Sequence, residues 1–249
     1  GRIHWLTTAR TGMLMVKQFD QGSSSDMWVL FDQHMDSVVA IGEDSTDEIG
    51  ATVAASVIDR YNRGFLPVGY ASHGSKSLVA APDRSAHQRE QIMRHIAASK
   101  PVGEISMLET LSDLERELGQ NTSLVVITAA RDGAWVEALG GLSKRGVRVS
   151  TVLIDRSSYG GDSNSEALDH LTAIGVSTYP ISRGDSISNA LLNPVGGAQE
   201  GLTRASTLAH AEPQPETDES SDSSADPVDA DAMSIFAPPP KADKQGGDK

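Results

Sequence analysis

The run Leu124-Val125-Val126-Ile127-Thr128 identifies the kind of sheet that this 249-residue chain forms. It is apolar apart from its last residue, a pattern typical of a strand buried on both faces of a parallel sheet. A segment of helical periodicity follows at about 135–144, and Gly146 marks its end. A second buried strand is predicted at 147–154. Strand, helix and strand in this order predict two parallel neighbours with the helix crossing one face.

The same alternation extends from this run in both directions. Further strands are predicted at 13–19, 27–31, 67–71, 77–81 and 176–181, with 67–71 and 77–81 joined as a hairpin through His73-Gly74. Helices are predicted to begin at Ser45, Ser85 and Ser106, each followed three residues later by Glu or Gln, and two more are expected at about 165–174 and 185–192. In the helix after Ser106 the stripe expected to face inward is Leu108, Leu111, Leu114 and Leu118. The prediction is an α/β fold: a doubly wound, mostly parallel sheet with helices on both faces.

Charge and composition divide the chain into three parts. The net charge is −13, and residues 195–249 hold 11 acidic and 4 basic residues, so this segment alone carries −7. It has no apolar period, which predicts a disordered acidic tail. We expect a lead-in segment at 1–25, a folded domain at 26–194 and the tail at 195–249. A chain this acidic repels phosphate backbones, so nucleic-acid binding is not expected.

Other classes of function are excluded by what the sequence lacks. There is no cysteine, which excludes disulfides, thiolate metal sites and cysteine catalysis. No apolar run reaches the roughly 18 residues that a membrane helix needs, so this chain is not expected to insert into a membrane. It begins at Gly1 without a signal peptide, and we expect it to be part of a longer protein.

In a doubly wound sheet, ligands bind where strand order reverses, at the carboxyl ends of the strands. The loops expected to form the site are therefore 32–37, 129–133 and 155–164. No catalytic residue is predicted within them. The run Gly160-Gly-Asp-Ser-Asn-Ser165 lacks the Gly-Lys-Ser/Thr ending of a phosphate loop, and its serines are expected to cap the next helix. No Gly-x-Ser-x-Gly elbow is present either.

Three short motifs near the start carry a family resemblance. They are Ile3-His4-Trp5, Thr8-Ala9-Arg10-Thr11-Gly12 and Leu14-Met15-Val16-Lys17-Gln18-Phe19. In this order they resemble the signature of the domain-of-unknown-function family 58, which leads into a domain like the von Willebrand factor type A domain. The resemblance covers about the first 190 residues. It implies a membrane-anchored parent that presents the domain on the cytoplasmic side, and a protein partner of the MoxR-type AAA+ ATPase class.

The resemblance also implies a metal-ion-dependent adhesion site, in which an Asp-x-Ser-x-Ser loop, a threonine and a late aspartate hold Mg²⁺. The corresponding loop here is Asp32-Gln33-His34-Met35-Asp36, with His34 and Asp36 at the serine positions. Ser106 is the candidate for the threonine. The late aspartate falls on Ala129, and Asp132 lies three residues further on. The site is therefore interpreted as degenerate and without a bound metal; a divalent cation such as Mg²⁺ or Mn²⁺ is the alternative.

These features together predict a non-enzymatic protein-interaction module. Its partner-binding loops would carry Asp32, His34, Asp36, Ser106 and Asp132. Two alternatives stay open at this point. One is a metal-dependent protein-binding domain at the same loops. The other is a nucleotide-binding or hydrolytic α/β enzyme, which the sheet architecture alone permits.

Overall fold

The structure is a computed structural model that describes residues 2–3, 16–17, 26–42, 44–120, 122–131 and 133–197. Most of the expected lead-in and nearly all of the expected acidic tail, with His4, Trp5 and Asp132, lie outside these residues. In the lead-in, β1 (Arg2–Ile3) pairs antiparallel with β2 (Val16–Lys17). The second of these strands falls inside the strand predicted at 13–19.

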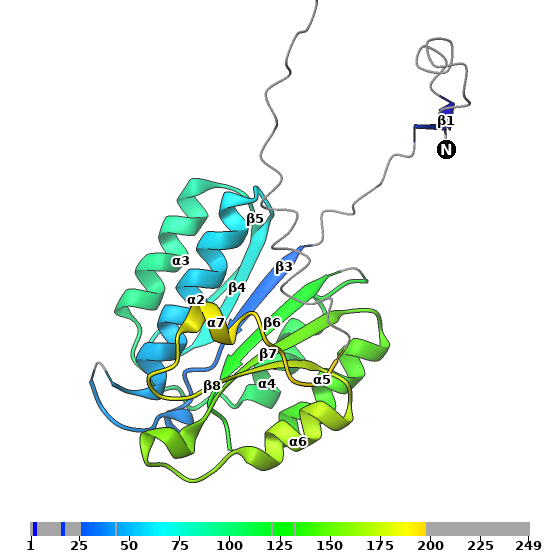
Figure 1. The fold of residues 1–249 in the computed structure, drawn as a ribbon. Coiled ribbons are helices and arrows are strands. Elements are labelled where there is room, and N and C mark those ends of the chain that lie inside the picture. The colour runs from blue at the N-terminus through cyan, green and yellow to red at the C-terminus, as the bar shows by residue number, and fades with distance from the viewer. Residues whose placement is uncertain are drawn as a thin grey trace, which may run out of the picture. The chain divides into compact units, whose positions relative to one another are not determined.

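A six-stranded sheet forms the centre of the domain, in the order β5-β4-β3-β6-β7-β8 (Figure 1). The strands are β3 (Met27–Phe31), β4 (Val68–His73), β5 (Ser77–Asp83), β6 (Ser123–Thr128), β7 (Arg148–Ile154) and β8 (Ser177–Ile181). All neighbours are parallel except the hairpin β4–β5. The predicted doubly wound, mostly parallel sheet and the predicted hairpin are confirmed.

Helices cover both faces of the sheet, because alternate residues of each buried strand point to opposite sides. In β3, Met27, Val29 and Phe31 pack with α2 (Thr46–Arg63), α3 (Ala86–Ala98) and α7 (Ile187–Ala190). Trp28 and Leu30 face the other layer, which consists of α4 (Met107–Leu114), α5 (Ala134–Lys144) and α6 (Ser165–Ala173). The two apolar cores lie on either side of the sheet.

Helix boundaries follow the predicted capping residues. The Ser45 hydroxyl accepts a hydrogen bond from the Glu48 amide at the start of α2, and Ser106 and Glu109 form a reciprocal capping box at the start of α4. The inward stripe predicted for α4 is wrong at Leu108, which is 42% exposed. Met107, one position earlier, is buried with Leu111 and Leu114, and the helix ends before the buried Leu118.

The two outer strands limit what can pair with the sheet. At one edge, β5 contains Pro82, which has no backbone N–H to donate. At the other edge, Thr178 of β8 exchanges backbone hydrogen bonds with Val195, at 3.0 and 2.7 Å. Two residues on, and therefore facing the same outer side, β8 carries Pro180. Both edges are thus interrupted as templates for a further strand.

Among the described helices, none combines the length and the apolar character that crossing a membrane requires.

Candidate functional site

Three loops meet at the carboxyl edge of the sheet, beyond the ends of β3, β6 and β7. The parallel register pairs Phe31 with Ile127, and Thr128 with Leu153, so these strands end at one level. Strand order reverses here, because β4 lies on one side of β3 and β6 on the other. The loops are those predicted at 32–37, 129–133 and 155–164, at the position where doubly wound sheets bind ligands.

Three donors from within the protein hold the Asp32 carboxylate. Its Oδ2 accepts hydrogen bonds from the hydroxyls of Ser37 and Thr128, both at 2.6 Å, and its Oδ1 accepts one from the His34 amide at 3.0 Å. Hydrogen bonds to a charged acceptor are roughly twice as strong as those between neutral groups. Asp32 therefore fastens the 32–37 loop to the end of β6.

His34 directly precedes the short 3₁₀ turn η1 (Met35–Ser37), and Asp36 lies within it. Nδ1 of His34 accepts a hydrogen bond from the Asp36 amide at 3.2 Å and so caps this turn. The Asp36 side chain is 87% exposed, and its carboxylate lies 3.8 Å from His34 Nδ1. The turn orients His34, whereas Asp36 presents its carboxylate to solvent.

Ser106 reaches the same site through backbone pairing between two loops. The Met35 amide donates to the Gly103 carbonyl and the Gly103 amide donates to the Gln33 carbonyl, each at 3.0 Å. The Ser106 hydroxyl donates to Glu109 Oε2 at 2.9 Å as part of the capping box. The hydroxyls that bond to Asp32 come instead from Ser37 in the same loop and from Thr128 in β6. Of these two, Thr128 takes the role expected of Ser106 as the hydroxyl from a distant segment. Its position as the only polar residue of the 124–128 run was the signal that could have identified it.

Arg156 is a candidate site residue that sequence reasoning missed. It begins η2 (Arg156–Tyr159) and is only 9% exposed. Its Nη1 donates to the carbonyls of Asp36 at 2.8 Å and Ala129 at 3.0 Å, which links all three loops. Within the described residues its Nε is buried without a hydrogen-bond partner. The pKa of the Arg156 guanidinium is lowered, mainly by burial and also by the nearby charge of Arg131, while Asp162, Asp36 and Asp32 act to raise it.

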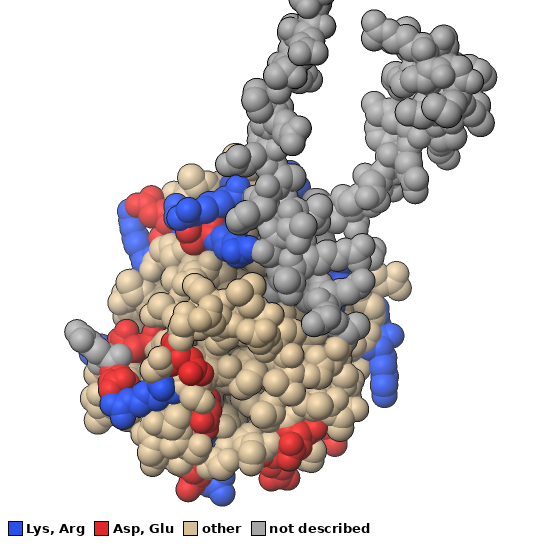
Figure 2. All heavy atoms as spheres, viewed as in Figure 1, with Lys and Arg blue, Asp and Glu red and all other residues tan. Residues whose placement is uncertain are grey.

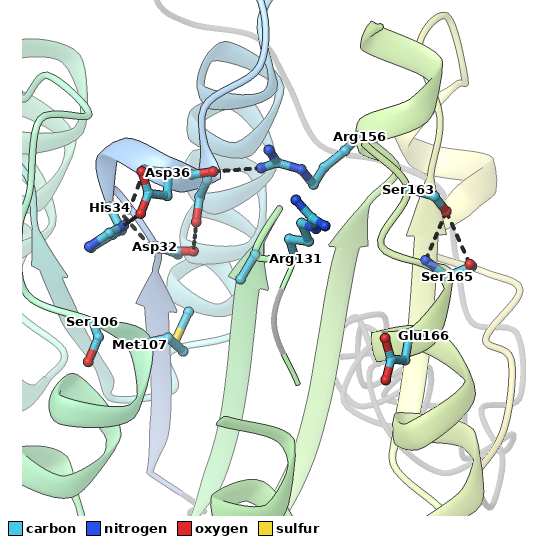
Figure 3. A pocket seen from close by; sticks show the side chains of 12 residues that line it. Asp32, His34, Asp36, Ser106, Met107, Arg131, Arg156, Ser163, Ser165 and Glu166 are labelled. Carbon is cyan, nitrogen blue, oxygen red and sulfur yellow. Dashed lines mark hydrogen bonds and ion pairs between the residues drawn. The ribbon is translucent and has the colours of Figure 1, made fainter. Parts of the chain in front are cut away.

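The three loops and the start of α4 enclose a pocket of about 650 Å³ (Figure 3). Arg131 and Arg156 point into it between Asp36 on one side and Ser163 and Ser165 on the other. The residues that line it are Asp32, His34, Asp36, Ser37, Ser106, Met107, Ala130, Arg131, Arg156, Ser163, Ser165 and Glu166. The pocket therefore unites four of the five predicted binding residues, while the fifth, Asp132, lies outside the described part of the chain.

The wall formed by 162–166 is built differently from the prediction. Neither predicted serine is the N-cap residue of α6; that residue is Asn164, whose side chain makes no cap hydrogen bond. The Asn164 side chain turns back instead, and its Nδ2 donates to the Ile154 carbonyl at 2.9 Å. Ser163 Oγ accepts a hydrogen bond from the Ser165 amide at 3.1 Å. The start of α6 therefore lines the pocket with Ser163 and Ser165, and its first amide is held by Ser163 instead of by the N-cap side chain.

Behind Asp32 lies a second carboxyl group, that of Asp47 in the first turn of α2. Burial raises the pKa of Asp47 to about 6, against a hydrogen bond from the Gln33 amide that lowers it. Among the described residues, its Oδ1 is buried without a hydrogen-bond partner. Gln33 is itself buried, and its Oε1 accepts a hydrogen bond from the Ser72 hydroxyl at 2.8 Å. Asp47, Gln33 and Ser72 thus form a buried polar layer beneath Asp32, in which one carboxylate oxygen has no hydrogen-bond partner among the described residues.

The described residues do not fit the metal site that the resemblance implies. Mg²⁺ takes an octahedral set of oxygen ligands, yet both Asp32 oxygens already accept hydrogen bonds and His34 stands at a serine position. The Arg156 guanidinium adds a fixed positive charge at the same strand ends. No group of three or more His, Cys, Asp or Glu side chains within the described ranges is placed to hold a metal ion.

Comparison with solved structures places the fold among von Willebrand A-like domains. The chain superposes on BatB from Bacteroides thetaiotaomicron with a TM-score of 0.51, at 14% identity, covering 74% of this chain and 98% of that one. The SpRpn10 VWA domain matches at a TM-score of 0.49 and 14% identity, with 70% and 97% covered. Proximal thread matrix protein 1 from the mussel byssus, in a form with a zinc-occupied MIDAS motif, matches at 0.49 and 15%, with 74% and 48% covered.

Comparison with protein sequences gives one match and one negative result. No curated protein matches the sequence. The model of the family described as "Protein of unknown function DUF58" matches residues 1–158, well over half of the chain. The predicted resemblance is thereby confirmed by this match: the chain belongs to the DUF58 family.

Proposed function

We propose that this domain is a non-enzymatic protein-interaction module that binds its partner at the carboxyl edge of the sheet without a metal ion. The observation that carries the proposal is the mixed character of that edge. A charged pocket lies beside a rim of exposed apolar side chains. The rim consists of Val102, Ile105 and Leu108 in the 102–108 segment and of Met35 in η1. Apolar side chains beside satisfied polar groups are typical of protein interfaces.

The segment that carries this apolar rim is held rigidly. Gly103 pairs with Gln33 and Met35 through backbone hydrogen bonds, and Ser106 starts α4 with a complete capping box. A surface that is already ordered loses little conformational entropy when a partner binds. The rim and the pocket therefore form one preorganised face, with Asp32, His34, Asp36 and Ser106 as proposed partner-binding residues, together with Asp132.

The partner proposed on the strength of the family resemblance is a MoxR-type AAA+ ATPase, met at the cytoplasmic face of the membrane by a membrane-anchored parent. Nucleic acid is not proposed as a partner. On the face shown in Figure 2, acidic and basic side chains of the described residues are interspersed around a broad uncharged area. That distribution differs from the continuous basic surface that phosphate backbones require.

Two observations favour binding over hydrolysis. Nδ1 of His73 lies 3.0 Å from the Ser77 hydroxyl in the β4–β5 hairpin, and neither of these residues lines the pocket. The other ring nitrogen of His73 is buried without a partner in the described residues, so no third group orients the ring as a nucleophile–base pair requires. The serines that line the pocket are Ser37, Ser106, Ser163 and Ser165. Their hydroxyls bond to the Asp32 and Glu109 carboxylates, which serve as a loop anchor and a helix cap, and to each other, and none of these bonds goes to a histidine.

The test is capture of a MoxR-type ATPase from the same organism by the purified chain, with ATP or ADP and with or without EDTA. We expect Val102→Asp combined with Ile105→Asp to abolish capture and EDTA to leave it unchanged. The matched control is Phe65→Asp, which removes an 81% exposed apolar side chain just beyond the far end of α2. Capture that survives the double variant, or that EDTA abolishes, would contradict the proposed face or its independence of metal.

A further inference from the structure

We infer that the pocket is a carboxylate-binding site, in which the buried Arg156, together with Arg131, Ser163 and Ser165, takes an aspartate or glutamate side chain of the partner. The inference rests on the proposed function for the existence of a protein partner, and it adds what the pocket recognises. It follows from four observations.

The first observation concerns unused hydrogen-bond donors. Arg156 is only 9% exposed, and the two hydrogen bonds that its side chain donates to other described residues both leave from Nη1. Nε is buried and has no partner within the described residues. A buried cation with few acceptors is costly, and a carboxylate placed against the guanidinium where it lines the pocket offsets that cost through its opposite charge. A guanidinium presents its donors as a planar fork, which matches a carboxylate.

The second observation is the convergence of further donors on the same space. Arg131 points into the pocket beside Arg156, and Ser163 and Ser165 line the same pocket on the α6 side, with their hydroxyls bonded to each other (Figure 3). α6, nine residues long, begins at this wall; its first amide bonds to Ser163 Oγ and its N-cap Asn164 makes no side-chain cap, so the positive end of the helix dipole lies beside the pocket. Two cations, two hydroxyls and a helix start thus surround one position.

The third observation is rigidity at the charged end. The Nη1 hydrogen bonds tie Arg156 to loops 32–37 and 129–133, and Asn164 Oδ1 accepts the Arg156 amide at 3.4 Å. The guanidinium therefore does not need to be ordered when the ligand arrives. Arg131 is different: it is 66% exposed and is paired with the exposed Asp162 at 2.8 Å. That pair contributes little by itself and can rearrange around a second carboxylate.

The fourth observation selects a singly charged anion over phosphate. Asp36, Asp162 and Glu166 border the same donors, with Asp32 behind them. A dianion would meet more repulsion from these acids than a carboxylate would. The acids also leave room for a basic residue of the partner next to its acidic one. The recognised element is therefore an acidic side chain with the apolar rim nearby, and the fixed cation is supplied by the protein.

The experiment uses the full chain labelled with ¹⁵N-arginine and follows the Nε–Hε resonances by NMR. The probe is N-acetyl-aspartate N-methylamide, and the isosteric N-acetyl-asparagine N-methylamide is the neutral control. We expect a saturable shift of the Arg156 resonance with the acid, in EDTA, and no such shift with the amide. Arg131→Gln should weaken the affinity by about fivefold, the upper range for one exposed charge pair.

Arg156→Gln removes the central donor, but the same change can disrupt the loops that Arg156 joins. Arg131→Gln and Ser165→Ala, both at the pocket wall, therefore serve as variants that leave the core intact. Equal shifts with acid and amide, or an affinity unchanged in both variants, would overturn the carboxylate site. Tighter binding of inorganic phosphate than of the acid would overturn the choice of ligand. Failure of ATPase capture with a positive titration would instead count against the proposed partner alone.

Discussion

The Thr128 hydroxyl donates to Asp32 Oδ2 across 2.6 Å, although 96 residues separate the two in the chain. Thr128 also accepts a hydrogen bond from the Ala130 amide at 2.8 Å, so one hydroxyl positions both the 32–37 and the 129–133 loops. With Arg156, which bonds to the same two loops from the third, it keeps the pocket open at a fixed width. Four predictions follow from the contacts in and around this site.

Thr128→Val keeps the shape of the side chain and removes its hydroxyl. We expect a loss of about 1–3 kcal/mol in the free energy of unfolding, because a carboxylate and an amide each lose a buried partner. Urea denaturation followed by circular dichroism measures this loss. The control is Thr151→Val in β7, since Thr151 is equally buried but its Oγ1 has no partner in the described residues. An equal loss in both variants would show that the Asp32 contact contributes nothing specific.

Asp47→Asn should change how stability depends on pH. In the folded state the pKa of Asp47 is raised to about 6 from 3.8, so the folded protein binds this proton more tightly than the unfolded chain does. Stability from this group is therefore present below about pH 4 and is lost as pH rises to about 6. The free energy of unfolding of the variant, relative to wild type, should rise across that window. Urea denaturation at several pH values tests it, with the exposed neighbour Glu48→Gln as control; a flat difference would contradict the expectation.

Gly103→Ala should disrupt the backbone pairing of Gly103 with Gln33 and Met35 and so destabilise the fold. A Cβ at this position would stand 1.8 Å from the His73 carbonyl oxygen and 3.0 Å from that of Gln33, both of them backbone atoms. We expect a cost of at least about 2 kcal/mol, as in overpacked cores. Gly141→Ala is the control, because that glycine lies inside α5 with open space around it, and alanine there should add about 0.5–1 kcal/mol. Thermal unfolding separates the two; similar melting temperatures would contradict the geometry.

Titration with Mg²⁺, Mn²⁺ and Zn²⁺ should give no saturable heat in calorimetry. Asp32 already accepts hydrogen bonds from Ser37, Thr128 and the His34 amide, and the Arg156 guanidinium opposes a second cation nearby. Asp32→Ala is the informative comparison, because it removes the one conventional ligand of the implied site. Micromolar binding to the wild type that is lost in this variant would restore the metal-dependent alternative.

The parts of the fold that rest on local chemistry were predictable from sequence. The start of α2 at Ser45 and of α4 at Ser106 follows from capping residues, and β6 follows from its apolar run. Strand order does not follow from periodicity, because it depends on long-range pairing; the family resemblance implied it. The outward position of Leu108 was missed for a related reason, since the neighbours of α4 decide which side of a short helix is buried.

The candidate site likewise has parts that the sequence predicted and parts that it did not. The three loops were predictable, because strand ends in a doubly wound sheet define them. Asp32, His34 and Asp36 were identified as one run of sequence. Arg156 and Thr128 were not, because each acts on a loop that is distant in the chain, and their residue types carry no motif. The domain limits at 26–194 and the role of Asp132 stay predictions.

The interrupted outer strands have a consequence for how this protein meets other molecules. At one edge of the sheet, Pro82 interrupts the row of backbone donors. At the other edge, Pro180 does the same, and Val195 already pairs with Thr178, so an added strand finds no continuous backbone to bond to. Association by strand addition, the route to fibrous aggregates and to many peptide complexes, is disfavoured at both margins. Contacts with other proteins are then left to side chains, such as those of the loops at the carboxyl edge of the sheet.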